Sequence, residues 1–121
     1  MRKNIKIGEK EFPFEANLGT TRLYEKLTGK NILNIMVNFR NNPDVNSGVQ
    51  MLNVFIRLAY VMNVQATTDS IKEMMNKMTE DQELEWEFGF DLSDFNEEVL
   101  TELGNLFGAT QKTHSEAASK N

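Results

Sequence analysis

The amino-acid sequence predicts an α+β domain that is mainly helical, with an N-terminal β-hairpin packed on a bundle of four to five helices. Three observations lead to this fold class. Residues 4–15 alternate apolar and polar side chains, as paired strands do. Residues 49–66 are apolar over most of a helical surface, so we expect them to form the central helix. Shorter apolar stripes at helical spacing lie on either side, and 121 residues suffice to bury one core.

The hairpin is predicted from two short runs around a glycine-containing turn. Ile5 and Ile7 share one face of the first strand, and Phe12 and Phe14 share one face of the second. Because Pro13 has no backbone N–H to donate, we expect the second strand at a sheet edge, or with Pro13 facing away from its partner. A two-stranded ribbon is marginal alone, so its Ile and Phe face must pack on helices.

Two helices are predicted before the central one. The first has an apolar stripe over 23–27, with Thr20 as its N-cap and Gly29 as the residue that ends it. The second has apolar residues at helical spacing over 32–39. The Asn-, Pro- and Gly-containing segment 41–48 is predicted to be the loop that follows.

The central helix over 49–66 is predicted to keep only a narrow polar stripe, made of Gln50, Asn53, Arg57 and Tyr60. A membrane span is the alternative for so apolar a segment. Arg57 near its middle and the regularly spaced amides would be costly in lipid, so a soluble core helix is the preferred interpretation. The polar stripe is the one side of this helix that the core need not cover.

The C-terminal third is less regular. A capping box at 70–73 predicts the start of a helix, and a second one at 94–97 predicts a last helix that ends near Gly108. Between them, 79–90 alternates acidic and apolar residues, which leaves an amphipathic strand and a partly ordered loop both open. The chain is thus divided into one domain over 1–108 and a tail over 109–121 that is expected to be disordered.

Charge is distributed unevenly along the chain. Residues 1–78 hold eleven Lys or Arg and seven Asp or Glu, whereas 79–121 hold two and eleven. Nucleic-acid binding depends on clustered cations, so nucleic acid is not expected as a partner. The absence of Cys excludes disulfide and thiolate chemistry, and no apolar run follows the basic N-terminus, so a cytoplasmic protein is expected.

The acidic C-terminal third raises the question of a metal or acid–base site. Its carboxylates miss the spacing of an EF-hand loop, so solvent-facing or partner-facing surface is the preferred interpretation and a ligand site is the alternative. His114, the one His, lies in the predicted tail, which argues against a zinc site or a His-based triad. We predict no catalytic, cofactor-binding or metal-binding residue. A metal-dependent enzyme would have to use Asp91, Asp94, Glu97 and Glu98.

Several Met and aromatic residues are candidates for binding a partner. The Met side chains either fill the core or line a groove for a partner helix. The aromatic residues among the acids fit interface hot spots as well as an edge strand, and the polar stripe adds two more candidates. The full set is Phe12, Phe14, Arg57, Tyr60, Met74, Met75, Met78, Trp86, Phe88 and Phe90.

Three segments give the chain a resemblance to a known family: IKIGEKEFPF at 5–14, NLGTTRLY at 17–24 and LAYVM at 58–62. With these segments in this order, the sequence resembles, over 1–107, the tail assembly chaperones of long-tailed phages and prophages of Gram-positive bacteria. Leu18 departs from the pattern, because a smaller residue is expected there.

The resemblance implies a non-enzymatic protein of virion morphogenesis that binds the tape measure protein, keeps its apolar helices soluble and helps recruit tail tube subunits. It places the protein in the bacterial host cytoplasm and outside the finished virion, with no nucleic acid or membrane as partner. An exposed hairpin edge would allow copies to form an oligomer. The alternative function is an acidic adaptor or nucleic-acid-mimicking inhibitor, suggested by the lysine-free acidic stretch over 80–102.

Overall fold

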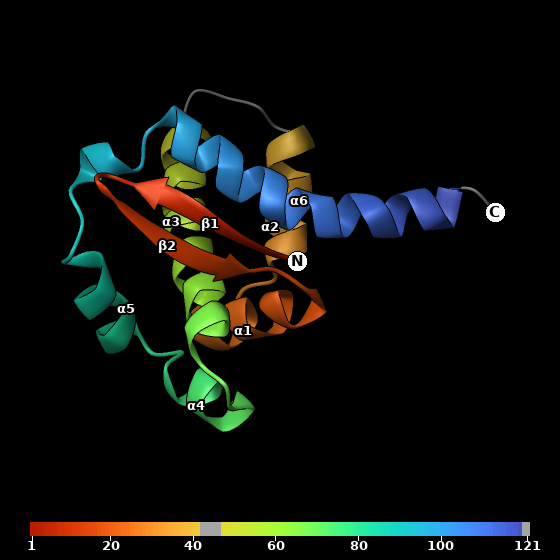
Figure 1. The fold of residues 1–121 in the computed structure, drawn as a ribbon. Helices are drawn as coiled ribbons and strands as arrows, with labels where there is room; N and C mark the ends of the chain where they lie inside the picture. Colours follow the sequence, from red (N-terminus) through yellow and green to blue (C-terminus); the bar gives the residue numbers. More distant parts are fainter. Residues whose placement is uncertain (42–46, 120–121) are drawn as a thin grey trace.

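The computed structural model describes residues 1–41 and 47–119, and it confirms the predicted fold class: an α+β protein that is mainly helical. A two-stranded antiparallel hairpin lies across the helices α3 and α6, with β2 against α3 and β1 against α6 (Figure 1). In chain order the elements are β1 (Arg2–Ile7), β2 (Lys10–Glu15), α1 (Leu18–Thr28), α2 (Ile32–Asn41), α3 (Ser47–Thr67), α4 (Ile71–Asn76), α5 (Glu80–Glu87), the 3-10 helix η1 (Leu92–Asp94) and α6 (Glu97–Ser119).

The hairpin has the predicted strands, and its inner face belongs to the core. Ile5, Ile7 and Phe14 are each at most 2% exposed. Pro13 lies opposite Asn4 in the register, and its carbonyl accepts a hydrogen bond of 2.9 Å from Asn63 Nδ2 on α3. A two-stranded sheet has only edge strands, so the missing N–H of a proline is tolerated. The hairpin is therefore attached to α3 by apolar packing and by a side-chain hydrogen bond.

Asn17, and not Thr20 as predicted, is the N-cap of α1. Asn17 Oδ1 accepts a hydrogen bond from the Gly19 N–H, while Thr20 Oγ1 accepts one from the Asn17 N–H, each at 2.9 Å. The Asn17 side chain also accepts from the Thr20 N–H, which completes a capping box. The sequence does not distinguish these two positions, because Asn and Thr are both favourable N-cap residues. The N-cap is the residue with extended backbone angles directly before the helix, which is Asn17.

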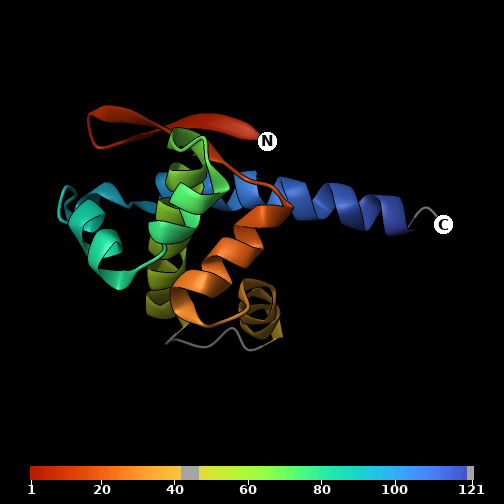
Figure 2. The same cartoon turned by 90° about the horizontal axis from the view of Figure 1, so that it is seen from below.

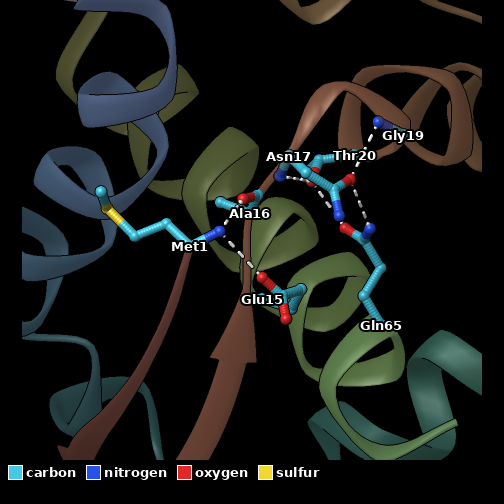
Figure 3. Close-up of polar contacts among 7 residues, drawn as sticks. All are labelled: Met1, Glu15, Ala16, Asn17, Gly19, Thr20 and Gln65. Carbon is cyan, nitrogen blue, oxygen red and sulfur yellow. Dashed lines mark hydrogen bonds and ion pairs between the residues drawn. The ribbon is translucent and has the colours of Figure 1, made fainter. Parts of the chain in front are cut away.

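Gln65, near the end of α3, joins this cap to the core (Figure 3). Its Nε2 donates to Asn17 Oδ1 at 3.0 Å, and its Oε1 accepts from Thr20 Oγ1 at 2.6 Å. We call these three residues the Asn17–Thr20–Gln65 clasp. Beside it, the amino group of Met1 donates to the Ala16 carbonyl at 2.8 Å and to Glu15 Oε2 at 2.9 Å. Contacts between distant parts of the sequence thereby fix where the hairpin leads into α1.

Gly29 ends α1 as predicted, in the left-handed conformation with φ of 74°. Replacing Gly29 with Ala should destabilise the protein by about 1 kcal/mol, because a Cβ is strained at this φ although no atom lies within 4 Å of its position. Gly108 is the matched control, since it lies inside α6 with equally open space around it. Gly108→Ala should be neutral or stabilising by up to about 1 kcal/mol. Urea denaturation of both variants measures the change in the free energy of unfolding. An equal change of the same sign in both variants would contradict the prediction.

The central helix is confirmed with slightly wider bounds, Ser47–Thr67. Leu58, Ala59, Val61 and Met62 have no measurable exposure, so this helix is the centre of the core. The predicted polar stripe is only partly correct, because Tyr60 is 3% exposed. Within the described residues, no helix is both long enough and apolar enough to cross a membrane. The predicted loop over 41–48 falls largely on 42–46, outside the described residues.

Residues 80–87 form the helix α5, so the strand and the partly ordered loop considered for 79–90 are both wrong. Thr79 caps the helix through a hydrogen bond of 3.3 Å from the Gln82 N–H to its Oγ1. The first turn carries Glu80, Asp81 and Glu83, which favour a helix N-terminus electrostatically. The alternation of acidic and apolar residues wrongly predicted a strand or a loop. In a helix these alternating residues lie on different sides and do not form one apolar face.

The start of α4 agrees with the sequence, whereas both ends of α6 differ from the prediction. Ser70 Oγ accepts a hydrogen bond of 3.2 Å from the Glu73 N–H, as expected. Asn96 rather than Asp94 caps α6, by accepting from the Val99 N–H at 3.0 Å. The helix continues to Ser119 instead of ending near Gly108, and its C-terminal half extends beyond the other elements (Figure 1). The division into a domain over 1–108 and a tail over 109–121 stays a prediction.

Candidate functional site

A groove of about 1200 Å³ lies between α2, α3 and α5. Helices α2 and α5 lie on opposite sides of α3 in both views (Figures 1 and 2). The floor of the groove is one face of the N-terminal half of α3, and the walls of the groove carry both apolar and charged side chains. The lining residues are Tyr24, Lys30, Ile35, Asn38, Phe39, Gln50, Asn53, Val54, Ile56, Arg57, Glu80, Glu83, Leu84 and Glu87.

Helical spacing places these side chains at the groove. On α3, Gln50, Asn53 and Arg57 are three and four residues apart and therefore share one face. On α5, Glu80, Glu83 and Glu87 are spaced in the same way. Thr79 caps α5 directly before Glu80, so all three carboxylates belong to one regular helix.

Arg57 forms ion pairs with two carboxylates of α5 in the groove. Arg57 Nε lies 3.4 Å from Glu83 Oε2, and Arg57 Nη2 lies 3.6 Å from Glu80 Oε1. The Glu83 side chain is only 2% exposed, and its Oε2 is buried without a hydrogen-bond partner. A carboxylate in this position loses most of its hydration and recovers only part of it through Arg57.

Glu83 is therefore a perturbed acid. Burial raises the pKa of Glu83 from its ordinary value to about 7, while the Arg57 guanidinium opposes the shift and the neighbouring Glu87 adds to it. Burial also raises the pKa of Tyr60 to about 12, and the Tyr60 hydroxyl donates to the Lys77 carbonyl at 2.6 Å. Tyr60 thus stays neutral, whereas Glu83 changes its charge near neutral pH.

An aromatic cluster fixes the position of α5. Trp86 packs against Tyr60 of α3, with ring centroids 5.5 Å apart, and against Phe90 at 4.7 Å. Phe90 in turn contacts Phe12 of the hairpin at 5.1 Å and Phe95 at 5.5 Å. These tilted and edge-to-face arrangements are the favourable ones for aromatic rings. The cluster anchors the wall that carries the carboxylates.

The predicted partner-binding residues do not form one surface. Phe14, Tyr60 and Met78 are buried in the core, so in this conformation a partner cannot reach them. Phe12, Arg57, Met74, Trp86 and Phe90 are half-buried, whereas Met75 and Phe88 are exposed. Of the whole set, only Arg57 lines the groove.

The groove residues that the sequence reasoning missed are chiefly Glu80, Glu83, Leu84 and Glu87 on α5 and the apolar pair Ile35 and Phe39 on α2. A signal for α5 was present in Thr79, a good N-cap followed directly by acidic residues. Nothing in the sequence indicated that α2 and α5 lie on either side of the same face of α3. That arrangement depends on long-range packing.

The part of the chain that the structure describes contains no group of three or more His, Cys, Asp or Glu residues positioned to hold a metal ion. The groove instead offers apolar contact together with one buried, partly paired carboxylate. No protein-family model, curated protein or solved structure matches the chain.

Proposed function

We propose that this protein is a non-enzymatic tail assembly chaperone of a long-tailed phage or prophage of Gram-positive bacteria, and that it binds the tape measure protein. In this proposal it acts in the host cytoplasm, assists assembly of the tail tube, works as a homo-oligomer and is absent from the finished virion. Neither nucleic acid nor a membrane is a partner. The starting point is the resemblance carried by residues 5–14, 17–24 and 58–62.

One observation carries the proposal: the groove is wide, and the described part of the chain leaves apolar side chains of its walls partly exposed. Leu84 is 47% exposed on α5, and Ile35 and Phe39 are half-buried on α2. Recesses of this kind accept an amphipathic helix, whose apolar side chains pack against those of the walls. A tape measure protein supplies long helices with apolar faces that need covering before assembly.

The acidic-adaptor alternative has less support, because several carboxylates of the acidic segment already have cationic partners. Glu80 and Glu83 pair with Arg57, and Glu102 Oε1 lies 3.6 Å from Lys3 Nζ. A nucleic-acid mimic needs free charges in a regular array. Binding of a basic partner that weakens steeply with added salt would favour this alternative over the chaperone.

Co-expression with the tape measure protein of the same phage tests the proposal. The chain should raise the soluble fraction of the tape measure protein and co-purify with it. Leu84→Asp should abolish this effect by placing a charge on the groove wall, whereas Leu92→Asp is the matched control at a site 72% exposed and outside the groove. A tape measure protein that is equally insoluble with and without the chain would refute the chaperone function.

A further inference from the structure

Three carboxylates give the groove an acidic wall. Glu80, Glu83 and Glu87 lie on one face of α5, while Lys30 and Arg57 are its cationic lining residues. Arg57 reaches Glu80 and Glu83 only at 3.4 to 3.6 Å, outside the range of a good hydrogen bond. The groove therefore retains capacity to accept hydrogen bonds from a further cation.

Glu83 is the buried member of this acidic wall. Glu83 Oε2 has no hydrogen-bond partner although it is shielded from water. Its ion pair with Arg57 Nε, at 3.4 Å, is too long for a good hydrogen bond, so the cost of burying this carboxylate is only partly offset. A donor that arrives with a ligand lowers that cost. Glu80, whose side chain is 75% exposed, stands at the open side of the same wall. A cationic side chain from outside would meet Glu80 first.

Apolar side chains next to this wall indicate that the ligand has an apolar part beside its cation. Leu84 lies between the carboxylates on α5, and Ile35 and Phe39 form an i, i+4 pair on α2 across the groove. The volume of about 1200 Å³ exceeds the range of roughly 300–1,000 Å³ that is usual for small-molecule pockets. A polypeptide segment fits these features better than a small amine does.

We infer that the groove between α2, α3 and α5 binds an amphipathic α-helix that carries a Lys or Arg beside its apolar stripe, with the cation placed among Glu80, Glu83 and Glu87. The inference rests on the proposed chaperone function and specifies which segments of the client bind. Burial of apolar surface in the groove contributes most of the binding free energy, and the acidic wall selects helices with a basic residue at the correct position. Apolar helices that lack this cation bind more weakly.

The direction of the pH dependence follows from the groups around Glu83. Those that face it are Arg57 and Tyr60 from α3, Tyr24 from α1, and Glu80 and Glu87 from its own helix. A cationic ligand binds the ionised carboxylate better, so binding near pH 6 must first remove a proton from part of the Glu83 population. Affinity should therefore rise between pH 6 and pH 8, and Glu83→Gln should lose most of this rise.

Overlapping fluorescent peptides that cover the tape measure protein of the same phage are the probe, and fluorescence anisotropy gives their Kd values. The tightest peptides should be amphipathic helices with a Lys or Arg next to the apolar stripe. Glu87→Lys should weaken their binding by at least about tenfold, and exchanging the peptide's cation for Glu should restore it. Glu98→Lys, the same change on an exposed carboxylate of α6, should leave the Kd unchanged.

The outcomes separate the inference from the function on which it rests. If neither a peptide nor the full-length tape measure protein binds, the chaperone proposal fails and this inference fails with it. If the full-length client binds equally well to the wild type, Glu87→Lys and Leu84→Asp, the chaperone proposal stands and the groove is excluded as the binding site. Restoration of binding by the charge exchange cannot arise from misfolding, because the same variant protein is used with both peptides.

Discussion

Replacing Leu58 with Ala should lower the free energy of unfolding by about 3–5 kcal/mol. Leu58 has no measurable exposure and lies in α3, the helix that packs against β2, α1 and α6. Removal of its side-chain atoms leaves a cavity in the core, which the surrounding structure closes only in part. Since domains of this size are stable by only roughly 5–15 kcal/mol, the variant should be close to unfolding at 37 °C.

Urea denaturation followed by circular dichroism measures this loss, because the transition midpoint falls while the slope is unchanged. Leu18→Ala is the matched control, since Leu18 lies in the first turn of α1 and is 75% exposed. It should change stability by no more than about 0.5 kcal/mol. If both variants lost the same small amount, α3 would not be the centre of the core.

The second large effect is a loss of stability as the pH rises from about 4.5 to about 7. The pKa of Glu83 is higher in the folded protein than in the unfolded chain, so the folded state binds more protons between these two values. Stability contributed by protonated Glu83 is fully present below the unfolded pKa, and it is lost as the pH rises through the folded one. At about 1.4 kcal/mol for each unit of pKa, the expected loss is on the order of 3 kcal/mol.

Glu83→Gln isolates this contribution, because it keeps the shape of the side chain and removes its titration. Subtracting the pH–stability curve of the variant from that of the wild type should leave a curve that falls between pH 5 and pH 7 and is flat at higher pH. Arg57→Ala should extend the fall to higher pH, since Arg57 lowers the pKa of Glu83. Parallel curves for the wild type and Glu83→Gln would show that Glu83 is hydrated in the folded state.

The sequence predicted the elements whose pattern is local and regular. Alternation around Ile5 and Phe14 is enough to identify the hairpin, and the long apolar face around Leu58 identifies α3. The sequence could not predict that Asn17 rather than Thr20 is the N-cap, because this depends on where the backbone changes from extended to helical at the start of α1. Local periodicity therefore determines the presence of an element better than its ends.

The candidate site was largely beyond the reach of sequence reasoning. The sequence shows Arg57 as a polar residue in an apolar helix, but its partner Glu83 lies in a segment whose pattern predicts a strand or a loop. Tyr60 was placed on the same polar stripe, yet Trp86 covers its ring and the Lys77 carbonyl binds its hydroxyl. Each of these pairings joins segments at least seventeen residues apart, so only the packing of the segment 77–87 against α3 reveals it.

The Asn17–Thr20–Gln65 clasp has a mechanical consequence for the groove. Thr20 and Gln65 are 45 positions apart, and together they close a loop of the chain that contains the whole of α2. Helix α2 packs mainly against α1, and none of its residues takes part in the clasp. A shift of α2 would therefore change the width of the groove without breaking the clasp or opening the hairpin contact with α3. We expect the acidic wall to keep its place when α2 shifts, because the contact between Tyr60 and Trp86 attaches α5 to α3 without α2.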